Sequence, residues 1–151
     1  MRRRHIVANI LLGDGVLLIL AGFLHLLATP VARAWMERDI TAQTFRSLPV
    51  PFLLNHLTVG MLLIPFGVST MYSAAGVRVG QVWARNIAIT NGLAVLLIPL
   101  LILFFMGGAF FDAPLFLYMA ALTTLIGLSM LLPLIWLRGH DGEDPPPHMH
   151  P

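Results

Sequence analysis

The chain contains no cysteine. This absence excludes disulfides, thiolate metal sites, cysteine-ligated iron–sulfur clusters and the covalent attachment of c-type haem. It leaves ligation of a metal or a haem by histidine open, because the sequence contains six histidines. Lysine is absent as well, and all nine basic residues are arginine. We attach no function to that preference.

Charged residues of either sign are scarce. They make up 11% of the 151 residues, and hydrophobic residues make up 58%. A soluble domain carries about 25% charged residues. The net charge is only +2, so nucleic acid is a poor partner. The composition is that of a membrane protein whose main surroundings are the lipid bilayer.

Four long apolar stretches hold most of the hydrophobic residues. Each is long enough to cross a bilayer, which takes about 20 apolar residues. They cover residues 6–29, 51–74, 83–106 and 114–137. We therefore predict an all-α fold, an integral membrane four-helix bundle over residues 1–138 with an up-down-up-down helix order.

The two ends of the chain differ in character. The start, "MRRRH" before an apolar run, resembles a signal peptide, but the run exceeds the usual 7–15 residues and contains Asp14. We therefore expect a retained helix. Residues 139–151 are polar and include three consecutive prolines, so we expect a disordered cytoplasmic tail.

Arginine counts predict the orientation. With the N-terminus inside, six arginines fall in inner segments and three in outer loops. This distribution favours both termini in the cytoplasm and a multi-pass protein of the inner (plasma) membrane. The long outer loop after residue 30 is expected to begin with a short interfacial helix.

Two histidines lie near the same end of their apolar stretches. His25 precedes Pro30 by five residues, and His56 follows Pro51 by five. Because neighbouring helices run antiparallel, the two imidazoles are expected at one depth, beside Asn55. They could be hydrogen-bonded polar contacts. They could also bind haem b as two axial ligands, a quinone headgroup, or a metal whose identity two ligands do not determine.

Asp14 is the single acid within the four stretches. It shares a helix face with His25, about 16 Å away along the axis. Thr90 and Asn91 are expected at its depth, as are the hydroxyl residues Ser69, Thr70, Ser73 and Ser129. The carboxyl could be held protonated or bonded to Asn91 or Thr90. It could also act as a proton or cation relay.

Glycine and proline shape the expected bundle. Gly60 and Gly67 fall on one face of the second stretch, where small residues let another helix approach closely. Pro65, Pro99 and Pro133 interrupt three stretches. Each removes the backbone donor for a carbonyl about one turn earlier. We expect kinks that fit the bundle.

No motif of a soluble enzyme is present, since the sequence lacks a Gly-rich phosphate loop, H-E-x-x-H and G-x-S-x-G. An enzyme is therefore not favoured. The layout resembles DoxX-like four-helix bacterial membrane proteins in helix count, chain length and basic N-terminus. That resemblance carries no motif and implies no activity.

Three functions fit these residues. The first is a small inner-membrane subunit or accessory protein without catalysis, in a homo-oligomer or a larger membrane complex. The second is a redox protein that binds haem, a metal or a quinone through His25 and His56. The third is a small proton- or cation-linked transporter that uses Asp14.

Overall fold

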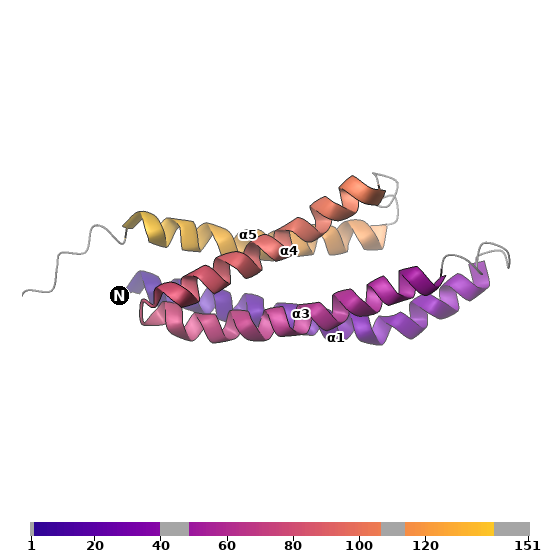
Figure 1. Ribbon diagram of the computed structural model, residues 1–151, viewed down its shortest axis with the longest axis horizontal. Coiled ribbons are helices and arrows are strands. Elements are labelled where there is room, and N and C mark those ends of the chain that lie inside the picture. The colour runs from indigo at the N-terminus through magenta and orange to yellow at the C-terminus, as the bar shows by residue number, and fades with distance from the viewer. Residues whose placement is uncertain (1, 40–48, 107–113, 141–151) are drawn as a thin grey trace, which may run out of the picture. The chain divides into compact units, whose positions relative to one another are not determined.

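The computed structural model describes residues 2–39, 49–106 and 114–140. Within these ranges the chain forms four helices and no strand, which confirms the all-α prediction (Figure 1). The helices are α1 (Arg2–Asp39), α3 (Pro49–Arg78), α4 (Val82–Met106) and α5 (Pro114–His140). Each contains a segment long and apolar enough to cross a membrane: Arg2–Val31, His56–Arg78, Val82–Phe104 and Leu117–Leu137.

The exposed helix surfaces are apolar. The side chain of Leu27 is 74% exposed and that of Phe104 is 81% exposed. In water such surfaces would be unfavourable over so many helical turns, whereas lipid tails solvate them. The four helices therefore fit a membrane protein.

The helix ends depart from the predicted ones mainly in α1. A break was expected after Thr29, with a separate interfacial helix beyond it, but α1 continues through Pro30 to Asp39. Proline fixes φ near the helical value and removes one hydrogen bond, so a long helix can continue through it. At the other end of the chain, Gly139 and His140 belong to α5 rather than to the tail. The rest of the predicted tail, 141–151, lies outside the described residues.

The chain divides into two compact units. One, which we call the four-helix unit, comprises residues 1–14 and 70–151 and contains α4, α5 and one end each of α1 and α3. The other, the two-helix unit, comprises residues 15–69 and contains the remaining parts of α1 and α3.

In the four-helix unit, α4 and α5 pack antiparallel at two glycines. A Cβ added to Gly92 would lie 3.0 Å from the side chain of Leu131, and one added to Gly127 would lie 3.0 Å from that of Leu96. The buried apolar residues come from all four helices and include large side chains. Fully buried among these are Val7, Leu11, Val77, Val95, Met130 and Leu134.

A tight turn joins α3 to α4. Gly80 has a φ of 81°, which favours glycine because other residues are strained there. Its N–H donates to the carbonyl of Val77 at 3.0 Å, and the N–H of Gln81 donates to that of Gly76 at 2.9 Å. These two bonds form a Schellman motif that caps the carbonyl end of α3.

In the two-helix unit, α1 and α3 approach closely and run antiparallel. A Cβ added to Gly67 would lie 2.5 Å from the carbonyl oxygen of Gly15. One added to Gly22 would lie 2.8 Å from the carbonyl oxygen of Gly60. Side chains larger than hydrogen would separate these backbones, so glycine sets the distance between the two helices.

Candidate functional site

The side chain of Asp14 is buried inside the four-helix unit, with 6% of its surface exposed. The hydroxyl of Ser129 on α5 lies 2.7 Å from its Oδ1 atom. Its other oxygen, Oδ2, is buried and has no hydrogen-bond partner among the described residues. A carboxyl group is thus enclosed with one of its two oxygens satisfied.

A second hydrogen-bonded pair joins α3 to α4. The Asn91 side-chain amide donates to the hydroxyl oxygen of Thr70 at 3.1 Å. Ser73, one turn along α3, donates to the Thr70 carbonyl at 2.8 Å. With Asp14, these three residues are the only buried polar side chains in the described part of the chain.

Contacts along the helices place these residues at similar levels. Arg78 donates to the side-chain oxygen of Asn9 at 3.0 Å. Moving five residues from Asn9 along α1 and five from Arg78 back along α3 reaches Asp14 and Ser73. Because both helices rise about 1.5 Å per residue, those two positions are level.

The polar residues of α4 and α5 also lie at similar levels. Gly92 contacts Leu131, so its neighbour Asn91 lies within about one turn of Ser129. Each of the four helices therefore contributes polar groups to one level of the unit. We call this set the polar layer; it consists of Asp14, Thr70, Ser73, Asn91 and Ser129.

The Ser129 hydroxyl has a single proton and two acceptors within reach. One is Oδ1 of Asp14 at 2.7 Å, and the other is the Ile126 carbonyl at 3.0 Å. If Asp14 is ionised, Ser129 donates to the carboxylate and Oδ2 carries buried negative charge without a partner. If Oδ1 is protonated, Asp14 donates to Ser129, and Ser129 donates to Ile126. The neutral acid is therefore much the better satisfied form.

The partners predicted for Asp14 were Asn91 and Thr90. Thr90 is exposed, whereas Asn91 beside it is buried, and the amide of Asn91 is bonded to Thr70. Ser129 was expected only at the right depth. A further signal was its position four residues before Pro133, because Pro133 supplies no N–H to the Ser129 carbonyl. The same residue thus brings both a hydroxyl and a carbonyl without its helical donor.

The two histidines meet in the two-helix unit. Their ring centroids are 4.6 Å apart and their planes are tilted by 30°. Nδ1 of His56 lies 3.0 Å from the hydroxyl oxygen of Thr29, and that hydroxyl donates to the His25 carbonyl at 2.9 Å. We call His25, His56 and Thr29 the histidine cluster.

The hydrogen bonds determine the ring protonation. Nδ1 of His25 lies 3.3 Å from the Ala21 carbonyl, which can only accept, so this nitrogen carries the proton. Because the Thr29 proton goes to the His25 carbonyl, Nδ1 of His56 is also the donor toward Thr29. Both Nδ1 atoms therefore act as donors within the cluster.

This geometry does not fit a haem between the two rings. A centroid separation of 4.6 Å is that of aromatic rings in direct contact, with no space for a third planar group. In the described part of the chain, no three His, Cys, Asp or Glu side chains come together as a metal site. Polar contact and hydrogen bonding to a small ligand remain the roles that the cluster can serve.

The other predicted residues are placed as follows. Gly60 and Gly67 both lie at the close approach of α1 and α3. Asn55 lies in α3, but its side chain falls outside the described ones. The polar layer and the histidine cluster are therefore the two candidate sites. No family model, curated protein or solved structure matches the chain.

Proposed function

We propose that this chain is a small proton-linked transporter in which Asp14 binds and releases the coupling proton. The observation that carries the proposal is the enclosed carboxyl of Asp14, with Oδ2 unpartnered among the described residues. Acidic residues within a membrane span are costly and commonly mark proton or ion pathways. A purely structural carboxyl would be expected to have both oxygens satisfied.

A proton suits this group better than a metal cation. A bound cation of the hard class takes about six oxygen ligands, whereas Asp14 has one described hydrogen-bonding neighbour, Ser129. The described hydrogen bond of the Asn91 amide is donated by its nitrogen to Thr70. A protonated carboxyl needs only one hydrogen-bond acceptor, and the Ser129 hydroxyl can accept this bond while it donates to the Ile126 carbonyl.

Proton release would then act on helix packing. When Asp14 loses its proton, Oδ2 gains charge that no described neighbour stabilises. Water must enter the polar layer, or α1 and α5 must move apart to admit it. Opening and closing of this layer would thus follow the charge of Asp14. Because four spans are few for a carrier, we propose that it works as an oligomer.

The arginine distribution supports an orientation for this transporter. Six arginines flank one set of span ends and three flank the other. We accordingly propose both termini in the cytoplasm and a location in the inner membrane. Because the chain contains no cysteine, single cysteines introduced near each end can be labelled by an impermeant reagent to test this orientation.

The test of the transport proposal is proton flux into liposomes that contain the purified full chain and a trapped pH-sensitive dye. An imposed membrane potential should acidify the interior for the wild type and not for Asp14→Asn, which keeps the shape of the side chain. Thr90→Val is the matched control, because Thr90 is a polar but exposed residue in a span. Equal flux for wild type and Asp14→Asn would contradict the proposal.

A second candidate, a subunit or accessory protein, is supported by the histidine cluster. Its rings are only half-buried, and its described surroundings within the two-helix unit are α1 and α3 alone. A polar group of a partner helix could bond to the exposed part of the cluster, since such groups join helices in membranes. In that case His25→Ala and His56→Ala would abolish co-purification of a partner, while Asp14→Asn would retain it.

A further inference from the structure

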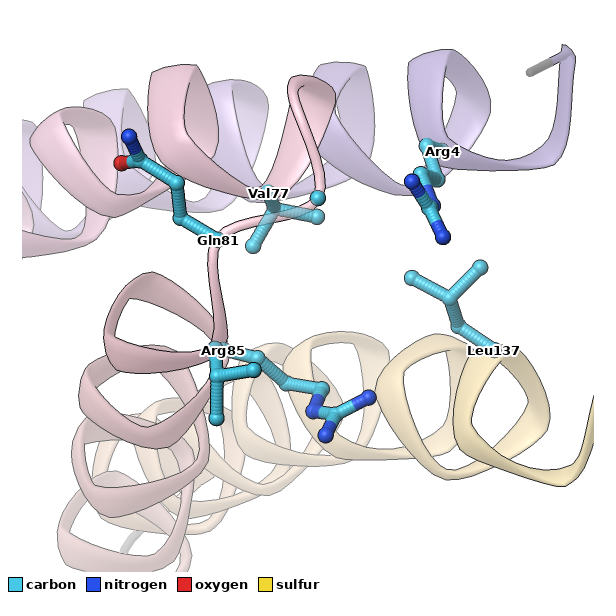
Figure 2. A pocket seen from close by; sticks show the side chains of 7 residues that line it. Arg4, Val77, Gln81, Arg85 and Leu137 are labelled. Atoms are coloured by element: carbon cyan, nitrogen blue, oxygen red, sulfur yellow. The ribbon is translucent and has the colours of Figure 1, made fainter. Parts of the chain in front are cut away.

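A small pocket lies in the four-helix unit where α1, the α3–α4 turn, α4 and α5 meet. Its volume is about 70 Å³, several times the 10–15 Å³ or so that one water molecule needs. Arg4 and Arg85 line it together with Gly80, Gln81, Leu137 and two valines. Figure 2 shows the side chains of Arg4 on α1 and Arg85 on α4 extending toward the space beside Leu137.

The pocket has a strongly positive lining. Among the described residues, its lining includes two guanidinium groups and no acid. Two more arginines lie at the same end of the unit and are held by neighbours: Arg78 donates to Asn9 at 3.0 Å, and Arg3 lies 5.2 Å from the centroid of the Trp136 ring. Four arginines at one end of the unit attract anions, and two of them place their positive charge at a single cavity.

The backbone holds Arg4 in place. Its guanidinium lies directly over Gly80, where an added Cβ would clash with Nη1 of Arg4. Gly80 in turn is held by the Schellman bonds at the end of α3. Arg4 therefore enters the pocket against a rigid turn. Arg85, in the first turn of α4, is half-buried, so both cations are partly ordered before any ligand arrives, which lowers the entropic cost of binding.

We infer that this pocket binds a phosphate group between Arg4 and Arg85. Guanidinium groups match phosphate oxygens with paired hydrogen bonds, and two of them from different helices can hold one phosphate from two sides. The phosphate can belong to an anionic phospholipid headgroup, because basic pockets between membrane helices bind such headgroups, or to a soluble phosphate. This inference does not depend on the proton chemistry of Asp14.

The experiment measures lipid retained by the detergent-purified full chain in native mass spectrometry. The probes are dioleoylphosphatidylglycerol and, as the zwitterionic comparison, dioleoylphosphatidylcholine. We expect the wild type to retain dioleoylphosphatidylglycerol preferentially. The variant Arg4→Gln/Arg85→Gln should bind that lipid about thirtyfold more weakly, because two arginines at roughly 1 kcal/mol each contribute about 2 kcal/mol. Arg2→Gln/Arg78→Gln is the matched control, because it removes the same charge from exposed positions outside the pocket.

Inorganic phosphate is the second probe and identifies the source of the group. Stabilisation of the wild type by inorganic phosphate without preferential lipid retention, lost in Arg4→Gln/Arg85→Gln, would assign a soluble phosphate to the site. If the double variant unfolds, the single variant Arg85→Gln gives the same comparison. Equal losses in the pocket variant and the control variant would overturn the inference, as would unchanged binding in the pocket variant, because either would leave only general charge attraction.

Discussion

The hydroxyl of Ser129 lies 2.7 Å from Oδ1 of Asp14, joining α5 to α1 across 115 residues of sequence. The same hydroxyl lies 3.0 Å from the carbonyl of Ile126 in its own helix. One hydroxyl proton makes a well-aligned hydrogen bond to only one of these acceptors at a time. The bond toward Ile126 therefore forms when Asp14 donates to Ser129, and the protonation of Asp14 sets the direction of the whole chain.

Ser129→Ala should destabilise the protein, because Oδ1 of Asp14 would lose its described partner and neither carboxyl oxygen would then have one. Interhelical hydrogen bonds in membranes contribute about 0.6 kcal/mol and up to about 1.7 kcal/mol, so we expect a loss in that range in reversible denaturant unfolding. Thr124→Ala is the control, because the described hydrogen bond of its hydroxyl goes to the Ala120 carbonyl in the same helix. A loss no larger than that of the control would contradict the role of Ser129.

Asn91 and Thr70 should be energetically coupled through their 3.1 Å bond. We expect Thr70→Val and Asn91→Leu to cost less together than the sum of the single changes, with a coupling of about 0.6 kcal/mol. Unfolding free energies of the two single variants and the double variant measure it. Strictly additive effects would mean that the two side chains do not act as a pair.

Gly67→Ala should destabilise the helix pair, because the new Cβ would meet the Gly15 carbonyl oxygen at 2.5 Å and α1 and α3 would have to separate. Overpacking of this kind costs roughly 1–3 kcal/mol. The matched change is Gly13→Ala, where no atom lies within 4 Å of the added Cβ. That variant should be neutral or more stable, since alanine favours the helix by up to about 1 kcal/mol. The midpoint temperature of thermal unfolding should fall in Gly67→Ala and should stay the same or rise in Gly13→Ala.

The histidine cluster should give no spectrum of a haem held by two axial histidines. The rings are in direct contact at 4.6 Å, which leaves no space for a porphyrin between them. The measurement is the visible absorption of protein expressed with ample haem, oxidised and then reduced, with metal analysis of the same sample. A Soret band that sharpens on reduction and disappears in His25→Ala would show that the cluster opens to bind a cofactor.

The long apolar stretches made the four helices predictable, since each stretch exceeds the length needed to cross a bilayer. The depth of the polar residues followed from helical rise and antiparallel order, which is why Asp14 and Ser129 were expected at similar levels. Their direct contact was not predicted. The spans are apolar on nearly all sides, so no amphipathic stripe indicates which face turns inward.

The absence of an amphipathic stripe also explains why the different burial of Thr90 and Asn91 was not predicted. They are adjacent in sequence and share a depth, yet one is exposed and the other is buried, because consecutive residues point to different sides of a helix. The extension of α1 through Pro30 to Asp39 was missed for a different reason. Proline weakens a helix without always ending it, and sequence alone did not distinguish the two outcomes.

The protonation of Asp14 can be measured by infrared difference spectroscopy of the membrane-reconstituted chain, because this method detects the carbonyl stretch of a protonated carboxyl group. Asp14 is the single acid within the four spans, and exposed carboxyls are ionised at neutral pH. We expect a protonated-carboxyl band at neutral pH that is absent in Asp14→Asn. The frequency of this band should shift in Ser129→Ala, and the band should disappear as the pH is raised. A spectrum identical in the wild type and Asp14→Asn across that pH range would contradict this expectation.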